Sequence, residues 1–418
     1  MEDNSYLKDT PQFISPRALG RIEVLKDPNR SGIDELIQKE FTPYTQSAIQ
    51  TINKIHSFQY MPYECLEKLT EYPNLMCYNG PSESILKKIF VAANTNITNP
   101  QIINVNPEKL LHLSKIVDIS YQWLVNIFNV NKINTIHLYL LSPDIKKVFP
   151  SDKNTVIGAN EVNSGENSPS YSDDKIKGIK IFRQEELIKV LIHETIHCGG
   201  FEKEFKGSHD KKYKVVGALK INETITETLA EFINCVLYAE KNDKQFDKVI
   251  RDEIDHGFMQ TAKILNHFGF TSVEDFLSDK KDDKMINQTT AAFEYHVLKS
   301  VLLYKYVDFF ELIPDPLTRT LENLMNLIDS TMRTDKMYIN AINAKIQNIE
   351  SLQPDEKASF RMSITNIDDD ESIPVITLKR KIDDVSMTGG LNHRNYQKHT
   401  YISHKNKYKQ LILNYKRY

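Results

Sequence analysis

The stretch LIHETIHCGG, residues 191–200, decides most of what the sequence predicts about the fold. It places His193 and His197 four residues apart, in an apolar run that ends at two glycines. On an α-helix, residues four apart share one face and lie about 6 Å apart along the axis, so both imidazoles can face one metal ion. Glu194 lies about 100° around the helix from His193, where its carboxylate can accept a proton from an attacking water. We therefore predict a helix that carries two metal ligands and one neighbouring base.

The residues around this run support a helix that follows a strand. Residues 177–182, KGIKIF, alternate as a strand does, and RQEELIKVLIHETIH follows directly. We expect Glu185 and Glu186 in the first helical turn, where the helix dipole favours negative charge, and Gly199 and Gly200 at its end. The alternative is an amphipathic helix that carries two histidines without a metal. A second, carboxylate-rich helix predicted over residues 222–241 favours the metal site.

A hydrolytic zinc ion keeps three protein ligands and one open position, so a third ligand is expected. With an HExxH helix and glutamates on the following helix, the sequence resembles the gluzincins, a class of zinc metallopeptidases in which a downstream glutamate completes the site. The resemblance covers about residues 158–240. It implies a zincin-like core, Zn²⁺ as cofactor, a peptide or protein substrate and Glu194 as general base.

Two registers of the second helix fit the gluzincin pattern. In TETLAEFI the third ligand is Glu227, and Glu231 orients His193 from behind. In NETITETL the ligand is Glu223, and Glu227 takes the orienting role. We prefer Glu227 as the metal ligand, because in that register the positions that must be buried hold apolar residues.

The resemblance also implies a Tyr or His from a later helix that binds the oxyanion. Our first choice is His296, followed by its neighbour Tyr295, with His256 and Tyr304 as further candidates. The alternative for each of them is an ordinary packing role in the core.

Residues 158–162, GANEV, resemble in part the GAMEN motif of one aminopeptidase branch, in which the glutamate binds the free amine of the substrate. That role would fall to Glu161. Asn160 replaces the methionine and Val162 the asparagine of the motif, so no exopeptidase is inferred. The alternative is a plain loop, since Gly, Asn and Ser mark turns.

We predict an α+β fold that is predominantly helical, with a small sheet packed on the HExxH helix and a helical C-terminal subdomain. Residues 82–93 are expected to be helical and residues 135–142, TIHLYLLS, to form the first strand. The expected regions are an irregular arm (1–33), a helical region (34–130), the sheet with the HExxH helix (131–220), a helical subdomain with the third ligand (221–347), and a mobile acidic then basic tail (348–418).

Composition narrows the partners and the location. The 418 residues carry a net charge of -3, which argues against a membrane or nucleic acid as the main partner. The exception is the last thirty or so residues, where basic and aromatic side chains alternate and could contact nucleic acid; a solvated tail is the alternative. Four cysteines without a CxxC pair favour a reducing compartment, and hence the cytoplasm.

Abundant Asn, Ile, Lys and Tyr are typical of an AT-rich genome, such as that of a large DNA virus, in which case the location is the host cytoplasm or the virion. The leading hypothesis is therefore a viral zinc metallopeptidase, a hydrolase. The alternatives are a non-catalytic zincin-like structural or interaction protein, for example a virion component, and a metal-free nucleic-acid binder that acts through the basic tail.

Overall fold

The computed structural model describes residues 42–43, 61–62, 64–65, 74–93, 107–130, 135–140, 145–169, 176–279 and 283–365. All of them belong to one unit of the chain, Leu19–Ile367. The predicted arm over residues 1–33 and the basic end of the predicted tail lie outside the described residues. In the ranges that are described, no helix is both long enough and apolar enough to cross a membrane.

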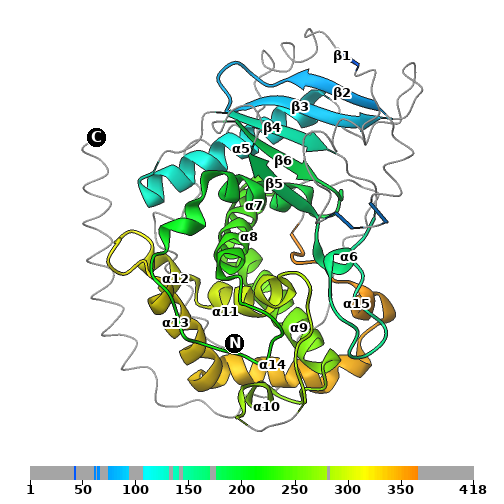
Figure 1. The fold of residues 1–418 in the computed structure, drawn as a ribbon, viewed down its shortest axis with the longest axis vertical. Coiled ribbons are helices and arrows are strands. Elements are labelled where there is room, and N and C mark those ends of the chain that lie inside the picture. The colour runs from blue at the N-terminus through cyan, green and yellow to red at the C-terminus, as the bar shows by residue number, and fades with distance from the viewer. Residues whose placement is uncertain are drawn as a thin grey trace. The chain divides into compact units, whose positions relative to one another are not determined.

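A mixed sheet forms one end of this unit (Figure 1). The central strands β3, β4 and β6 run parallel, and β5 pairs antiparallel with β6 at one edge. The register places Leu138 of β4 opposite Ile179 of β6, and both side chains are buried. In spatial order the six strands are β1 (Thr42–Pro43), β2 (Asn74–Asn79), β3 (Leu86–Ala93), β4 (Thr135–Leu140), β6 (Ile176–Ile181) and β5 (Gly165–Pro169).

Two predictions about this sheet were wrong. Residues 86–93 form strand β3 and not a helix, so β4 is not the first strand of the sheet. Ile89, Phe90 and Val91 are consecutive and all buried, because β3 lies inside the sheet between β2 and β4. A short apolar run buried on both faces has no alternation, and periodicity alone cannot distinguish it from a buried helix. The strand predicted over residues 177–182 is confirmed as β6.

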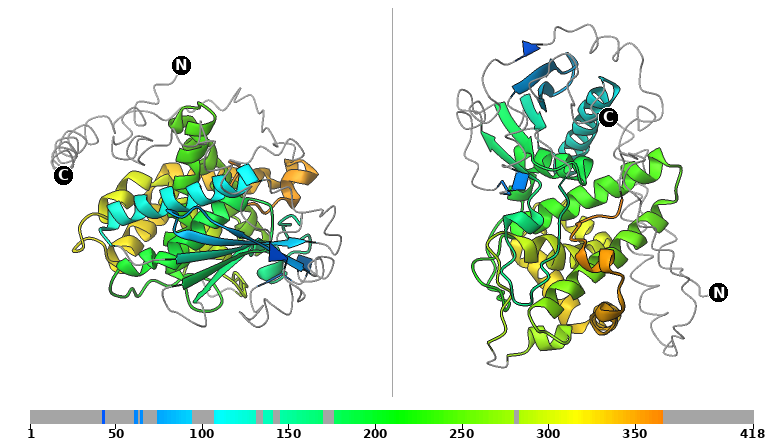
Figure 2. Two further views of the ribbon diagram at one scale, coloured as in Figure 1. Left: turned by 90° about the horizontal axis from the view of Figure 1, so that it is seen from above. Right: turned by 90° about the vertical axis from the view of Figure 1, so that its right-hand side faces the viewer.

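Two helices pack on one another beside the sheet. Within the region predicted to be helical (34–130), α5 (Pro107–Phe128) is a long helix, and it packs against β3 and against α7 (Leu187–Gly199). Helix α7 also packs against β5 and β6. Figure 2 shows α5 running along the sheet. The HExxH residues of α7 therefore lie between the sheet and the helices that follow.

Helix α7 begins later than predicted and ends where predicted. Glu185 and Glu186 lie before its first residue, and Glu186 has a positive φ of 61°. Their carboxylates do not face the helix dipole but accept hydrogen bonds from the backbone and side chain of Lys147. At the C-terminal end Gly200 has φ 60°, a conformation that glycine adopts without strain.

From residue 201 onward most of the described residues are helical, as the sequence predicted for residues 221–347. The centre of this helical part is α8, which is buried on nearly all sides, and α9 and α11 pack on it. Cys65, Cys198 and Cys235 are buried and free. The helices are η4 (Phe201–Glu204), α8 (Ile221–Lys241), α9 (Phe246–His267), α10 (Val273–Leu277), η5 (Glu294–Leu298), α11 (Lys299–Tyr304), α12 (Tyr306–Leu312), α13 (Leu321–Thr334), α14 (Lys336–Asn348), η6 (Ile349–Ser351) and α15 (Pro354–Ala358). Between β4 and β5 lies the short helix α6 (Ala159–Val162).

The prediction of a mobile tail over residues 348–418 was wrong for residues 348–365, which belong to the folded unit. Phe360 and Ser363 are fully buried. The backbone N–H of Ser363 donates to Glu186 over 2.6 Å, and that of Thr365 donates to Glu253 over 2.6 Å. Hydropathy did not reveal this segment, because it is held largely by main-chain hydrogen bonds to buried carboxylates. The folded unit therefore extends at least to residue 365.

Candidate metal centre

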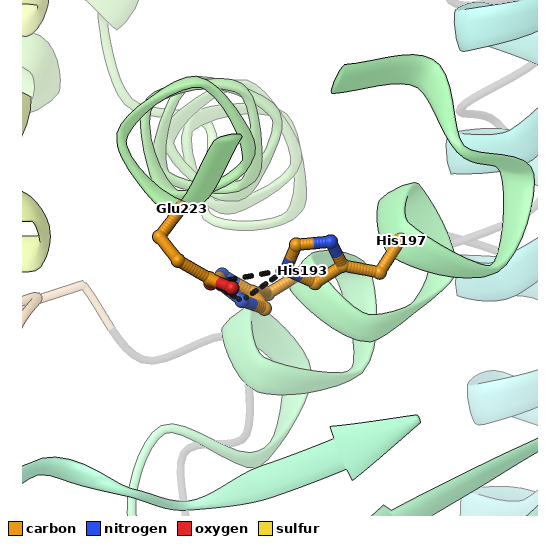
Figure 3. Close-up of side chains that lie close together, drawn as sticks. All are labelled: His193, His197 and Glu223. Atoms are coloured by element: carbon orange, nitrogen blue, oxygen red, sulfur yellow. Dashed lines mark hydrogen bonds and ion pairs between the residues drawn. The ribbon is translucent and has the colours of Figure 1, made fainter. Parts of the chain in front are cut away.

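Three side chains from two helices converge on one point (Figure 3). His193 and His197 project from α7, and Glu223 projects from the first turn of α8. The two Nε2 atoms lie 3.1 Å apart. Glu223 Oε2 lies 3.1 Å from Nε2 of His197 and 3.5 Å from Nε2 of His193. We call these three residues the metal centre.

The three distances fit a bound zinc ion. Zinc binds imidazole nitrogen and carboxylate oxygen at about 2.0–2.2 Å with tetrahedral angles, so any two ligand atoms lie roughly 3.3–3.5 Å apart. The observed separations are 3.5 Å, which lies in this range, and 3.1 Å twice, which is slightly shorter. The donor set of two imidazoles and one carboxylate is also the set that hydrolytic zinc sites use.

Each histidine has a carboxylate at its other ring nitrogen. Nδ1 of His193 lies 2.7 Å from Glu227 Oε2, and Nδ1 of His197 lies 3.4 Å from Glu202 Oε1. A neutral imidazole that donates from Nδ1 carries its lone pair on Nε2, so both lone pairs point into the metal centre. Two facing lone pairs repel each other unless positive charge lies between them. Carboxylates around both rings raise the pKa values of His193 and His197 against the lowering effect of burial.

The structure gives the third position to Glu223, where the sequence favoured Glu227. Glu227 lies behind His193, and its second oxygen accepts a hydrogen bond from Lys189 over 2.5 Å. The sequence preference assumed that the position held by Thr228 had to be apolar. Thr228 is buried nevertheless, because its hydroxyl donates to the carbonyl of Thr224 one turn earlier.

Glu231 does not orient His193 either. Glu231 is fully buried on α8, two turns after Glu223. The Nζ atom of Lys299 lies 3.4 Å from Glu231 Oε2. Together with Cys235 and Glu253 it forms a second group of possible metal ligands, which we call the inner cluster. Glu253 there accepts the backbone N–H groups of Ile364 and Thr365.

Glu194 lies beside the metal centre, against the edge strand β5. Its Oε2 accepts a hydrogen bond from Asn167 Nδ2 over 3.1 Å. A Cβ added to Gly165 would lie 3.0 Å from Glu194 Oε1, so a glycine there leaves room for the carboxylate. Burial raises the pKa of Glu194, against the lowering effect of the two histidines. A raised pKa suits a base that must accept and return a proton near neutral pH.

Tyr295, and not our first choice His296, reaches the metal centre. The Tyr295 hydroxyl donates to Glu223 Oε2 over 3.2 Å, and its ring lies 5.8 Å from that of His193. His296 has no described contact with the three residues of the metal centre: its ring stacks on Phe360, and neither ring nitrogen has a hydrogen-bond partner in the described structure. Both residues lie in η5, a single π-helical turn of the kind often found at functional sites.

The remaining candidates for substrate contact have other roles. His256 Nε2 donates to the carbonyl of Arg361, and Tyr304 contacts Asp335, so neither faces the metal centre. Glu161 accepts the backbone N–H of Gly158 and caps the short helix α6. The aminopeptidase-like role that the GANEV resemblance suggested for Glu161 therefore has no geometric support.

Sequence reasoning missed three residues that contact the predicted site residues: Asn167, Lys189 and Glu202. Lys189 had a local signal, because it lies four residues before His193 and therefore on the same helical face. Asn167 and Glu202 had none, since β5 and η4 approach α7 only in the folded chain.

Comparison with known proteins leaves the family open. No protein-family model matches the chain, and no solved structure matches it. It is 24% identical over 204 residues to "Uncharacterized protein R210" of Acanthamoeba polyphaga mimivirus, a match that covers 46% of this chain and 48% of that protein. The match thus spans about half the length of this curated relative. The relative is viral, while a viral origin of the present chain stays a prediction.

Proposed function

We propose that this protein is a zinc-dependent metallopeptidase of the gluzincin type, built on a zincin-like core. The metal ligands in this proposal are His193, His197 and Glu223, not Glu227. The observation that carries it is the convergence of their ligand atoms, which lie 3.1, 3.1 and 3.5 Å apart, close to the edge lengths of a zinc tetrahedron. Zinc bound there would supply Lewis acidity, polarising the scissile carbonyl and activating a water.

The neighbouring side chains suit the other tasks of peptide hydrolysis. Glu194 accepts a proton from the attacking water and passes it to the leaving nitrogen, while Asn167 holds its carboxylate in place. Tyr295 donates a hydrogen bond to the oxygen that gains negative charge. Burial and the neighbouring acids raise the pKa of Tyr295 well above its ordinary value, so its hydroxyl stays protonated and able to donate.

The edge strand β5 suits a peptide substrate. It pairs with β6 on one side and is the last strand in the spatial order of the described sheet. Asn167, the partner of Glu194, lies on this strand. An extended peptide that adds to the free side of β5 would run past the general base, which is the binding mode expected for main-chain recognition.

Metal content and turnover test this proposal together. Wild-type protein is expected to hold about one zinc per chain by elemental analysis and to cleave members of a peptide library. His193→Ala is expected to lose the metal. Glu194→Gln is expected to keep the metal and lose about 10²–10⁴-fold in turnover. Glu240→Gln, a half-buried acid at the far end of α8, serves as the matched control for a lost carboxylate.

Two outcomes would count against the proposal. A wild-type chain without stoichiometric zinc would reject the metal centre. Zinc at one per chain without cleavage of any peptide would favour the alternative, a non-catalytic zincin-like structural or interaction protein.

A further inference from the structure

A buried lysine lies directly behind the metal centre. Lys189 is one helical turn before His193 on α7, so the two side chains share a face. Its Nζ lies 2.5 Å from Glu227 Oε1, while Glu227 Oε2 lies 2.7 Å from His193 Nδ1. One carboxylate therefore connects an ammonium group on one side with an imidazole on the other.

The lysine and the carboxylate of this contact are both almost completely buried. Lys189 is 2% exposed and Glu227 is 1% exposed. Lysine is almost never buried so completely unless it is paired, because removing its charge from water costs several kcal/mol. The ammonium group also has a second contact, since it lies 3.2 Å from the Met362 sulfur in the C-terminal segment. The Lys189 side chain is therefore held in one position, unlike a lysine on the surface.

The position of Lys189 determines how Glu227 can face His193. A carboxylate with a single partner can turn about its last bond and offer either oxygen. With Oε1 held by Lys189, only Oε2 is presented to the ring, and the direction of that hydrogen bond sets the orientation of the imidazole plane. Partners behind a ligating histidine fix its tautomer and raise its affinity for metal.

We propose that Lys189 is a positioning residue of the metal centre, which acts through Glu227 to aim His193 Nε2 at the metal. This inference rests on the proposed function, because it assumes that His193 is a ligand. It adds a residue of this chain that the HExxH pattern and the downstream glutamate do not include.

The alternative is a purely structural ion pair, and the same interior contains one for comparison. Lys147 Nζ lies 2.6 Å from Glu186 Oε2, and both side chains are completely buried. The pair resembles Lys189–Glu227 in length and burial, but neither residue contacts a histidine of the metal centre through any described hydrogen bond. Lys147→Met is therefore the matched control for Lys189→Met.

The experiment measures zinc affinity by competition with a chromogenic chelator, together with the visible spectrum of the Co²⁺-loaded protein. Lys189→Met is expected to weaken zinc binding about 10-fold, the low end for loss of a partner behind a metal ligand, and to change the Co²⁺ spectrum. Lys147→Met is expected to lower stability in urea while leaving zinc affinity within about 2-fold and the spectrum unchanged. Equal zinc affinities in the two variants would overturn the inference.

A double variant tests whether the effect passes through Glu227, and covers the case in which Lys189→Met does not fold. Lys189→Met/Glu227→Gln buries no unpaired charge. Its zinc affinity is expected to equal that of Glu227→Gln within about 2-fold, because interacting residues are not additive. A further 10-fold loss would overturn the inference. Wild-type protein that binds no zinc would reject both this inference and the proposed function, whereas equal affinities in Lys189→Met and Lys147→Met would reject only this inference.

Discussion

The metal centre and the inner cluster each contain a glutamate of α8, but the charges around these two glutamates are balanced in different ways. Glu223 of the metal centre meets two imidazoles and the Tyr295 hydroxyl. No lysine or arginine pairs with it in the described part of the chain. Glu231 of the inner cluster, eight residues later, has the Lys299 ammonium group beside it. Two glutamates of one helix thus belong to two groups of metal-ligating residue types, and they have different partners: histidines for Glu223 and a lysine for Glu231.

The pKa values follow this difference. Burial raises the pKa of Glu223, but the two histidines outweigh it and hold the value far below the ordinary range. Burial and the neighbouring Glu253 raise the pKa of Glu231 to about 8, against the lowering effect of Lys299. The Glu231 carboxyl therefore holds its proton to higher pH than an ordinary glutamate, while Glu223 stays ionised beside the two histidines. A buried acid that is ionised needs a counter-charge, and the two glutamates find it in different side chains.

The largest expected effect would come from removing the counter-charge of the inner cluster. Lys299→Met leaves Glu231 and Glu253 without their ammonium partner and is expected to lower the free energy of unfolding by about 3–5 kcal/mol in urea titrations. Lys305→Met is the control, since Lys305 pairs with Asp335 at a partly exposed site and should contribute less than about 1 kcal/mol. A loss at Lys299 no larger than at Lys305 would show that the inner cluster needs no internal cation.

The same substitution made in both clusters tests the comparison directly. Glu223→Gln removes one of three proposed ligands and is expected to weaken zinc binding by roughly 100-fold or more. This loss corresponds to about a quarter of the binding free energy that is typical of structural zinc sites. Glu231→Gln is expected to leave zinc affinity unchanged, measured by chelator competition. Comparable losses in the two variants would mean that zinc occupies the inner cluster or both clusters.

A third test compares the turnover of variants at two adjacent residues of η5, Tyr295 and His296. Tyr295→Phe removes the hydroxyl at the metal centre and is expected to lower kcat about 100-fold with zinc retained, the typical cost of one oxyanion donor. His296→Gln alters a buried ring that stacks on Phe360, so it should lower stability and leave kcat of the folded fraction within about 3-fold. If kcat falls in His296→Gln and not in Tyr295→Phe, then His296 and not Tyr295 is the residue that binds the oxyanion.

The smallest expected effect concerns acid stability of the interior around the inner cluster. Burial lowers the pKa of His256 to about 3. Between pH 6.5 and about 3 the unfolded chain therefore takes up a proton that the folded chain does not, and stability falls by up to about 1.4 kcal/mol per pH unit as the pH drops. Going from pH 7.5 to 5, His256→Gln should lose about 2 kcal/mol less than wild type in urea titrations. Parallel pH profiles of the two proteins would contradict this buried, neutral state.

Most of what the sequence predicted correctly depends on local geometry. The 3.6-residue repeat of α7 puts His193 and His197 on one face and Glu194 beside them, whatever else the chain does. Glycines at residues 199–200 end the helix because Gly200 adopts a positive φ at little cost. The helical half after residue 220 was visible in the same way, from periodic apolar positions and caps.

Failures of sequence reasoning share a cause. A central strand such as β3 is buried on both faces and reads like a helix, and residues 359–365 are held largely by main-chain hydrogen bonds that hydropathy does not register. Tyr295 and His296 differ by one residue, and the π-helical turn that contains them determines which one faces the metal centre. None of these three features produces a periodic pattern of apolar residues or an unusual amino-acid composition, so the sequence did not reveal them.

The sequence by itself determined that the two histidines share one helical face with Glu194 between them, because these relations are set within little more than one turn of backbone. Only the tertiary structure decided that Glu223 and not Glu227 joins the histidines, and that Glu227, held by Lys189, lies behind His193. Both glutamates lie on the same helix one turn apart, so the choice between them depends on how α7 and α8 are placed against each other. That placement comes from the packing of the whole interior, which no local stretch of sequence specifies.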